Sequence, residues 1–302
     1  MQETLKELER ELKLRPKPVW DRYDEALRKE AFDFSEAYKS FLSESKTERE
    51  AVEWILEESQ RKGFSEKGPR KVFAVNREKA MALSVLGKRP LKEGLRIIVC
   101  HIDTPRLDLK QNPLFEDLEL AFFRTHYYGG IKKYHWVAQP LALHGVIVRE
   151  DGKRVKIRIG EEEGDPVFTC CDLLPHLARR TQEEKKLKEA IEAEKLTALV
   201  GHIPFPEDEE AKERVKLQIL KLLRDRYGIK EEDFTSSELQ LVPAGKARDL
   251  GLDRSFIGGY GQDDRVCAYC ALQAILGVEL SLIHISEPTR PLYISYAVFC
   301  LK

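Results

Sequence analysis

Two short motifs carry the residues of this sequence that are best suited to chemistry. His101-Ile102-Asp103 follows an apolar run, and Asp263 and Asp264 stand side by side after a glycine-rich stretch. A histidine that binds a metal usually donates its other ring N–H to a carboxylate, which fixes its tautomer. Residues two apart in an extended segment point the same way. We therefore interpret His101 as a candidate metal ligand and Asp103 as the carboxylate that orients it.

Asp263 is a candidate for a second ligand, because one carboxylate can bridge two metal ions about 3.5–4 Å apart. Purely structural interpretations remain open. His101 can be a satisfied core histidine, and Asp263 and Asp264 can simply cap the helix that follows them, where the helix dipole favours carboxylates. The metal hypothesis predicts that His101, Asp103 and Asp263 converge, with His101 and Asp263 less than about 10 Å apart.

The elements that must position these residues are a strand and a helix. Leu95–Cys100 (LRIIVC) has the apolar content of a strand buried on both faces, and polar residues at the end of such a strand are where open α/β sheets place their chemistry. Val266–Leu276 predicts an apolar helix directly after the two aspartates. Lys71–Val75 and Ala80–Leu86 predict two more strands.

The regions before and after these elements differ in the secondary structure that their sequences predict. Residues 1–66 predict helices, with a capping box in Thr47–Glu50 and a C-terminal glycine at Gly63. From about Leu107 to Val242 the pattern becomes β-rich. There we predict the following elements: a hairpin of Leu141–Arg149 and Val155–Ile159, a solvated helix or mobile loop over Thr181–Lys195, an amphipathic helix over Glu207–Tyr227 with Val215, Ile219 and Leu222 on one face, and a strand over Glu238–Val242.

The other histidines and the cysteines give weaker signals. His135 lies in YYGGIKKYHW, which is either a basic aromatic loop over a site or a tight turn with aromatic packing, and His176 in DLLPHL is equally ambiguous. His126, His144 and His202 have no informative spacing. The six cysteines are interpreted as small buried hydrophobes in a reduced cytosol, and Cys267 and Cys270 as helix packing.

Composition limits the class of protein. The chain has 302 residues, 34% of them charged, and a formal net charge of −1, which is typical of a globular protein and argues against binding to nucleic acid or to acidic membranes. It has no run of eighteen apolar residues that would predict a membrane span, and its charged N-terminus does not resemble a secretory signal. We therefore expect a cytoplasmic protein.

The last residues do not match the rest. Ser281–Lys302 has three charged residues in twenty-two and resembles translated sequencing-adapter read-through. The expectation is that the natural chain continues differently beyond Val278, and no function is assigned to His284.

Taken together, two motifs resemble one family. His101–Lys110 (HIDTPRLDLK) and Tyr260–Ala274 (YGQDDRVCAYCALQA) are similar to those of the M18 zinc metallo-aminopeptidases, the aspartyl aminopeptidase family, and the intervening segments are similar to its bacterial branch. The resemblance covers about residues 1–278. It implies an α/β fold: a zinc-exopeptidase-like α/β/α catalytic domain (1–107 and 247–280) with an inserted β-rich dimerisation domain (108–246), before a non-native tail (281–302).

The resemblance also implies a site and a function. His101 and Asp263 would be ligands of a two-zinc centre, Asp103 a catalytic residue that orients His101, and His176 a substrate-binding residue reaching a neighbouring subunit. The implied activity is removal of N-terminal residues from peptides by dimers, or by a dodecamer of them. The alternative is a non-catalytic assembly or peptide-binding protein of the same fold.

One departure from the family pattern affects the activity expected of this chain. The family's Glu-Glu pair, its further Asp ligand and its C-terminal His ligand have no counterpart in Ser281–Lys302. We therefore expect the chain as written to be poorly soluble and inactive.

Overall fold

The computed structural model describes residues 5–88, 90–206 and 212–278, so the predicted tail lies outside the described residues. They divide into two compact units, one up to Tyr38 and one from Lys39 on. The first unit contains α1 (Leu5–Leu12), a 3-10 turn η1 (Val19–Asp21) and most of α2 (Glu25–Glu44). Within the described ranges, none of the helices has the length and apolar content that crossing a bilayer requires.

The helical prediction for the N-terminal region is confirmed in its described part. α3 (Glu48–Arg61) begins with the predicted capping box: the Glu50 N–H donates to the Thr47 hydroxyl at 3.3 Å, and the Thr47 N–H donates to the Glu50 carboxylate at 2.8 Å. Gly63, at φ +83°, follows the helix end. A residue in this left-handed conformation satisfies the last free carbonyls of a helix, and glycine adopts it without steric cost.

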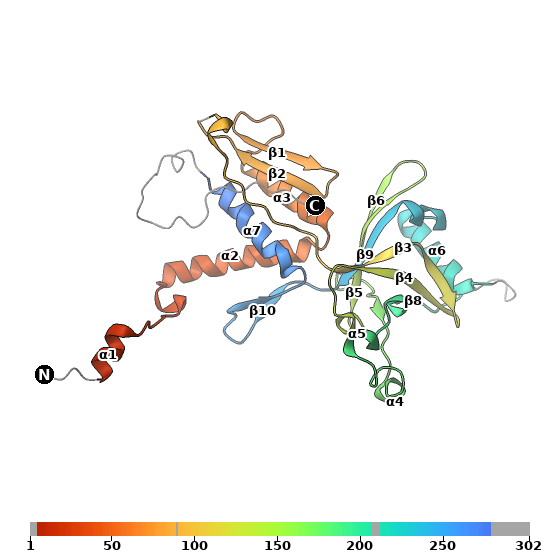
Figure 1. The fold of residues 1–302 in the computed structure, drawn as a ribbon. Helices are drawn as coiled ribbons and strands as arrows, with labels where there is room; N and C mark the ends of the chain where they lie inside the picture. Colours follow the sequence, from red (N-terminus) through yellow and green to blue (C-terminus); the bar gives the residue numbers. More distant parts are fainter. Residues whose placement is uncertain (1–4, 89, 207–211, 279–302) are drawn as a thin grey trace. The chain divides into compact units, whose positions relative to one another are not determined.

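A hairpin and two helices make the first apolar layer of the second unit. The predicted strands are confirmed as β1 (Lys71–Asn76) and β2 (Ala80–Val85), which pair antiparallel. α3 and α7 (Gln262–Leu276) pack against β2, as Figure 1 shows. Their contact buries the side chains of Ile55, Leu83 and Leu272 completely.

The predicted strand Leu95–Cys100 is wrong. This segment, which follows the 3-10 turn η2 (Leu91–Glu93), is extended without strand pairing; Ile97 is 56% exposed, and within the segment only Cys100 is buried. A buried strand needs hydrogen-bonded neighbours at its edges and cover on both faces. The described residues supply neither. Its apolar side chains therefore stay exposed, although the chain still delivers His101 and Asp103 to the end of the segment.

Seven antiparallel strands form the main sheet, in the order β6-β5-β9-β3-β4-β8-β7. They are β3 (Arg106–Asp117), β4 (Leu120–Tyr128), β5 (Leu141–Val148), β6 (Arg154–Ile159), β7 (Thr169–Cys170), β8 (Ala198–Gly201) and β9 (Ser237–Pro243). The predicted hairpin (β5 and β6) and the strand over Glu238–Val242 (β9) are confirmed. Six of these strands lie within residues 108–246, the region predicted as an insertion, and β3 begins just before it at Arg106. The domain boundaries themselves stay a prediction.

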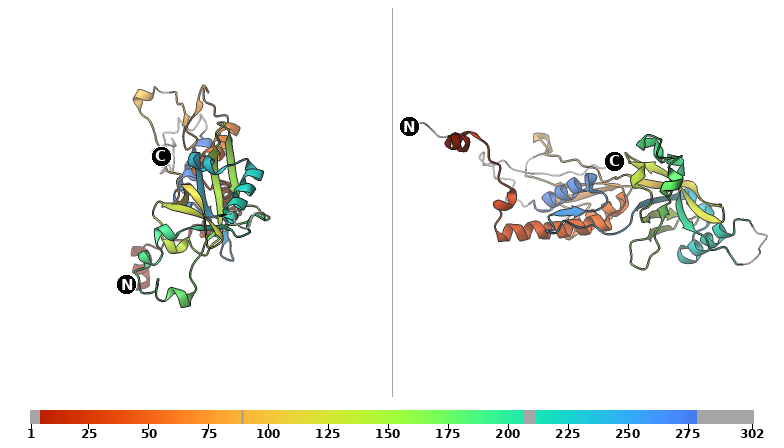
Figure 2. Two further views of the ribbon diagram at one scale, coloured as in Figure 1. Left: turned by 90° about the vertical axis from the view of Figure 1, so that its right-hand side faces the viewer. Right: turned by 90° about the horizontal axis from the view of Figure 1, so that it is seen from below.

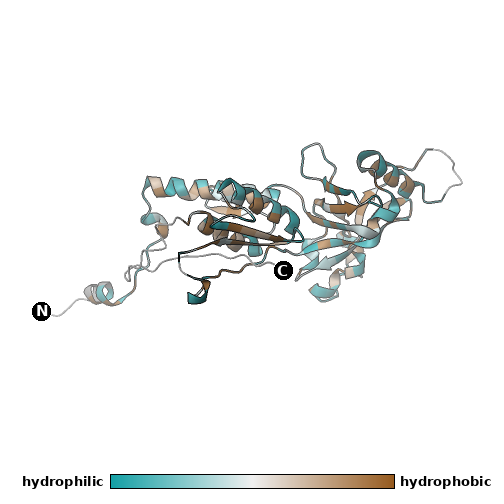
Figure 3. Ribbon diagram, turned by 90° about the horizontal axis from the view of Figure 1, so that it is seen from above, coloured by the Kyte–Doolittle hydropathy of each residue, from teal (hydrophilic) through white to brown (hydrophobic). Residues whose placement is uncertain are grey.

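One long helix covers part of this sheet. α6 (Arg214–Tyr227) packs against β3, β4 and β8 and lies alongside them in both views of Figure 2. It begins at Arg214, and residues 207–211 of the predicted helix lie outside the described residues. Val215, Ile219 and Leu223 face the core at helical spacing, whereas Leu222 is exposed, so its predicted place on that face is wrong. Figure 3 shows the alternation of hydrophilic and hydrophobic residues along this helix.

The remaining elements are short. The segment over Thr181–Lys195 is neither one helix nor one loop, because it combines turns with two brief helical pieces, α5 and η4. The short elements are η3 (Lys133–His135), α4 (Pro175–Ala178), α5 (Leu187–Ala190), η4 (Ala193–Lys195), η5 (Glu231–Ser236) and the hairpin of β10 (Arg248–Leu250) and β11 (Phe256–Gly258).

A buried group of charges connects the helices to the sheet. We call Lys46, Glu50, His144 and Glu161 the His144 cluster. His144, fully buried on β5, places Nδ1 2.8 Å from Glu50 and Nε2 3.1 Å from Glu161. Lys46, between α2 and α3, lies 3.6 Å from Glu161 and donates to the carbonyls of Pro243 and Gly245.

The geometry of the His144 cluster fixes its charges. Both ring nitrogens face carboxylates, and only the doubly protonated imidazolium can donate to both. Burial disfavours that cation, but the hydrogen bonds to Glu161 and Glu50 outweigh it and raise the pKa of His144. Burial also opposes ionisation of Glu50, yet the bond to His144 keeps its pKa below the usual value.

We expect His144→Gln to destabilise the protein most at low pH. A group whose pKa is raised in the folded state contributes stability below its ordinary pKa of about 6.5, and this is lost as the pH rises through the folded value. Removing the cation deprives two carboxylates of the imidazolium between them, so the free energy of unfolding should fall by about 3 kcal/mol at pH 6. The difference between the variant and the parent should shrink towards pH 9.

Urea denaturation of the parent and the variant at pH 6, 7, 8 and 9 measures this difference. His126→Gln, at an exposed position on β4, is the matched control and should show no such trend. A difference that stays constant across the range would contradict the charge assignment.

Candidate metal centre

The structure brings together the two residues predicted to share a metal. His101 Nε2 lies 3.3 Å from Asp263 Oδ1. This confirms the predicted convergence, well inside the 10 Å limit: His101 follows an unpaired extended segment, and Asp263 lies in the first turn of α7. Both side chains reach solvent, with exposed fractions of 48% for His101 and 93% for Asp263. The pair therefore sits at an accessible surface.

Asp103 fixes the histidine from the other side. His101 Nδ1 is 3.1 Å from the carbonyl oxygen of Asp103 and 3.3 Å from its Oδ1. Both partners accept hydrogen bonds only, so Nδ1 carries a proton. Nε2 faces the Asp263 carboxylate, and a metal ion binding there would take the place of any proton on Nε2. With Nε2 deprotonated, this nitrogen and the Asp263 carboxylate are two electron-pair donors facing one place, an arrangement that suits a metal ion.

Three hydrogen bonds join the segments that carry these residues. The Thr104 hydroxyl donates to the carbonyl of Asp263 at 3.0 Å, and the Tyr260 hydroxyl donates to the carbonyl of Pro105 at 2.9 Å. Arg265 Nε donates to the carbonyl of Ile102 at 3.2 Å. Ile102 lies between His101 and Asp103 and is buried, so the main chain there is held firmly while its two neighbours point outward.

Arg265 is the most deeply buried member of this arrangement. Its side chain is 1% exposed, and its Nη2 donates to the carbonyl of Lys46 at 3.1 Å. The guanidinium lies 5.6 Å from the centre of the Tyr260 ring. Gly261, at φ +89°, leaves the space that Arg265 needs, because a Cβ there would approach Nη1 to 2.5 Å. Sequence analysis did not single out Arg265, since nothing in its local pattern marks it as buried.

Tyr128, at the end of β4, also reaches the site and was missed by sequence analysis. Its hydroxyl donates to Asp103 Oδ2 at 2.7 Å, and this bond raises the pKa of the phenol. Tyr128 belongs to the aromatic motif YYGGIKKYHW, in which His135 was the candidate functional residue. His135 is exposed on η3.

The other predicted residues have different surroundings. Asp264 accepts a hydrogen bond from the thiol of Cys267, and this bond raises the pKa of the thiol to about 11. Cys267 and Cys171 are exposed, so the expectation of buried cysteines is wrong for these two, whereas it is confirmed for Cys100 and Cys170. His176 is exposed on the short helix α4.

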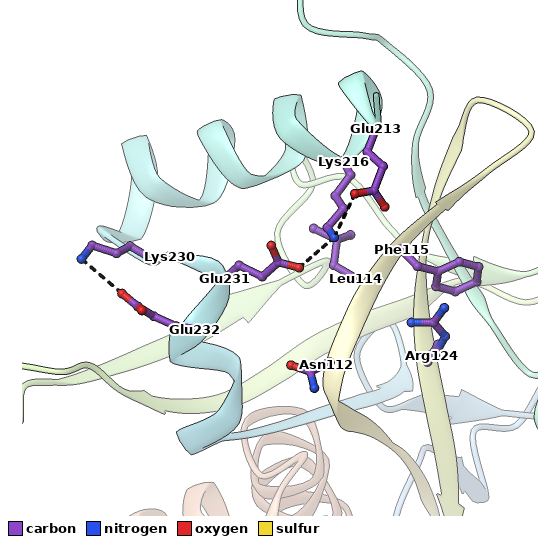
Figure 4. A pocket seen from close by; sticks show the side chains of 9 residues that line it. All are labelled: Asn112, Leu114, Phe115, Arg124, Glu213, Lys216, Lys230, Glu231 and Glu232. Carbon is purple, nitrogen blue, oxygen red and sulfur yellow. Dashed lines mark hydrogen bonds and ion pairs between the residues drawn. The ribbon is translucent and has the colours of Figure 1, made fainter. Parts of the chain in front are cut away.

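A pocket of about 650 Å³ lies elsewhere, between α6, η5 and the β3–β4 hairpin (Figure 4). Its central cation, Lys216, lies 2.9 Å from Glu231 and 3.5 Å from Glu213, so its charge is already paired. Arg124 stacks on Phe115. Lys230 likewise lies 3.2 Å from Glu232, so both lysines of this pocket are paired with its own carboxylates.

The donor set of the centre is partial in the part of the chain that the structure describes. No group of three or more His, Cys, Asp or Glu side chains able to hold a metal is found there. A zinc site needs about four ligands, of which at least three come from protein in catalytic sites. His101 and Asp263 fit two of these positions.

Comparison with known proteins gives the family. The family model described as "Aminopeptidase I zinc metalloprotease (M18)" matches residues 41–291. A probable M18 family aminopeptidase 1 from Clostridium acetobutylicum is 50% identical over 86% of this chain and 58% of its own length. The corresponding protein of Thermotoga maritima is 47% identical over 88% of this chain and 58% of its own length.

Solved structures agree with the sequence matches. The crystal structure of aminopeptidase I from C. acetobutylicum superimposes with a TM-score of 0.82 at 42% identity, over 95% of this chain and 63% of that one. The T. maritima M18 aminopeptidase structure gives 0.81 at 47% identity, over 88% and 59%. The mixed α/β fold is thus that of these structures, and the chain spans about three-fifths of the length of the relatives it matches. The chain belongs to the M18 family of zinc metallopeptidases.

Proposed function

We propose that this protein contributes to a zinc-dependent aminopeptidase, which removes N-terminal residues from peptides. The observation that carries the proposal is the meeting of His101 Nε2 and Asp263 Oδ1 at 3.3 Å, with Asp103 behind the imidazole. Family membership supplies the zinc and the class of reaction. A non-catalytic assembly or peptide-binding role is not favoured, because it gives no reason for two metal-ligating groups to face one point.

The residues of this chain would divide the work as follows. Bound zinc supplies a Lewis acid and an activated water at neutral pH. His101 would hold the ion through Nε2, and Asp103 would keep the imidazole in the tautomer that leaves Nε2 free. Asp263, which is largely exposed, has a second oxygen available for a second ion, so a two-ion centre is part of the proposal. Asp264 would be a neighbour and not a ligand.

Substrate contact and assembly are further parts of the proposal. His176 would reach the active site of a second copy, as the family resemblance implies. In support, α4 carries His176 beside Leu174 and Leu177, which are 65% and 61% exposed and are apolar surface that a second copy could cover. Dimers built into a larger ring, a cytoplasmic location and the inserted dimerisation domain are proposed on the same basis.

We expect the 302-residue chain to bind zinc weakly and through the proposed pair. With two ligands from the described residues the coordination shell is incomplete, so affinity should be modest. His101→Gln and Asp263→Asn should each weaken zinc binding at least tenfold, whereas Asp264→Asn, the matched control, should change it little. Competition with a chromophoric chelator measures the dissociation constants. Equal loss in Asp263→Asn and Asp264→Asn would remove Asp263 from the site.

Activity is tested in a chimera that joins this chain to part of a related protein. A chimera of residues 1–278 followed by the unmatched C-terminal part of the C. acetobutylicum protein should release a chromophore from aminoacyl substrates, and a chelator should abolish this release. His101→Gln in the chimera should lower kcat/KM at least a hundredfold, because it removes a metal ligand. The 302-residue chain should show no turnover.

Two results would contradict the proposal. Chelator-sensitive turnover by the 302-residue chain, at a rate near that of the chimera, would mean that its ligands lie elsewhere. A soluble, folded chimera that binds zinc but hydrolyses nothing would favour the non-catalytic alternative.

A further inference from the structure

We propose that Tyr128 is a positioning residue for the metal centre: its hydroxyl holds Asp103 so that Asp103 keeps the His101 imidazole with Nε2 free for the metal. The inference rests on the proposed zinc function and adds a member of the main sheet to the site. Tyr128 does not touch the metal position itself. It acts through Asp103.

The first step is the hydrogen bond. The Tyr128 hydroxyl lies 2.7 Å from Asp103 Oδ2, while Oδ1 of the same carboxylate lies 3.3 Å from His101 Nδ1. The two oxygens therefore have different partners, and the carboxylate plane is set by both. A carboxylate held at one oxygen only can rotate about its Cβ–Cγ bond, because terminal torsions of this kind are broad.

The second step is what holds the tyrosine. Arg106 lies directly opposite Tyr128 in the β3–β4 pairing, and its guanidinium stacks 4.1 Å from the ring centre. Arg106 is itself fixed and nearly buried: its Nη1 is 2.5 Å from Glu48 and its Nε donates to Asp108 at 2.8 Å. The phenol thus sits on a rigid cation anchored to the first turn of α3. A partly exposed ring in this position has little freedom to swing away.

The third step is the consequence for His101. A neutral imidazole can carry its proton on either nitrogen, and the acceptors on its two sides compete for it. Beside Nδ1 these are the Asp103 carbonyl at 3.1 Å and the Asp103 carboxylate at 3.3 Å, and beside Nε2 the Asp263 carboxylate at 3.3 Å. If the Asp103 carboxylate turns away, only the carbonyl is left beside Nδ1, and the balance shifts toward a proton on Nε2, which is the atom the metal needs. Outer partners of this kind typically change metal affinity 10- to 100-fold.

The test compares Tyr128→Phe with Tyr127→Phe in the 302-residue chain. The two tyrosines are neighbours on β4 with similar exposure, 40% and 36%, and each change removes one hydroxyl and keeps the ring. Successive strand residues point to opposite faces, so only Tyr128 faces Asp103. Asp103→Asn and the double variant Asp103→Asn/Tyr128→Phe complete a double-mutant cycle.

Two readouts are used, one of which needs no metal. Long-range ¹H–¹⁵N correlation spectra of histidine-labelled protein at pH 8 report which nitrogen of His101 is protonated, with His101→Gln used for assignment. Zinc chloride titration followed on the same resonances gives the dissociation constant. Thermal unfolding of each variant checks that the fold is intact.

We expect the parent and Tyr127→Phe to keep the His101 proton on Nδ1. Tyr128→Phe should move a measurable fraction of it to Nε2 and weaken zinc binding about tenfold, without a comparable loss of thermal stability. In the Asp103→Asn background, Tyr128→Phe should have no further effect.

The outcomes separate the inference from the function on which it rests. Identical tautomers in Tyr128→Phe and Tyr127→Phe, or equal zinc affinities in a chain that binds zinc at His101, would overturn the positioning role. An undiminished effect of Tyr128→Phe in the Asp103→Asn background would also overturn it. A tautomer shift in a chain whose His101 resonances do not respond to zinc would support the positioning role and refute the proposed metal site.

Discussion

The buried guanidinium of Arg265 is the interaction on which the candidate site depends. It donates to the carbonyls of Ile102 and Lys46, two residues far apart in sequence, while its own backbone follows Asp263 and Asp264 directly. A buried charge costs free energy unless it is hydrogen-bonded and compensated. Burial lowers the pKa of Arg265, and the nearby Tyr260, Glu48 and Glu50 oppose that effect. The site therefore forms only where the α2–α3 junction, the His101 segment and the start of α7 have already met.

Charged groups continue from this point into the main sheet. The carbonyl of Lys46 accepts a hydrogen bond from Arg265, and its ammonium group pairs with Glu161. Lys46 thereby links Arg265 to the other members of the His144 cluster. On a second route, Glu48 pairs with Arg106, on which Tyr128 stacks. Apolar packing is concentrated elsewhere, in the sheet with α6 and in the layer of α3, α7 and the β1–β2 hairpin. Polar contacts, which require defined partners and angles, thus connect two apolar cores and fix how the site residues meet.

The sequence predicted the features that depend on local physics. The capping box at Thr47, the hairpin around Gly152 and the helix after Asp264 are set by neighbouring residues, and all three are confirmed. The prediction of a strand over Leu95–Cys100 was wrong because apolar content indicates only a preference for burial. A strand also needs a neighbouring strand to pair with, which local sequence does not reveal. His101 and Asp263 converge as predicted, although the strand expected to carry His101 is absent, and their role as metal ligands stays a prediction.

Residues whose importance comes from distant partners could not be found in this way. His144 has no informative spacing, because its two carboxylate partners, Glu50 and Glu161, lie on other elements. Tyr128 meets Asp103 only because the β3–β4 hairpin folds back toward the residues that precede β3. Such pairings follow from strand register, which is settled by the packing of the whole sheet.

The way in which the ligands are held has a consequence for metal binding. His101 and Asp263 come from segments far apart in the sequence, and bonds between those segments impose their approach to 3.3 Å. The imposing bonds are those of Thr104, Tyr260 and Arg265, and every one of them ends on a main-chain carbonyl. Hydrogen bonds to the main chain hold these segments in place in the folded protein. The conformational entropy lost in ordering the ligands is therefore lost when the protein folds. The free energy of metal binding at such a site then comes mainly from the coordination bonds and is not reduced by the entropy cost of ordering the ligands.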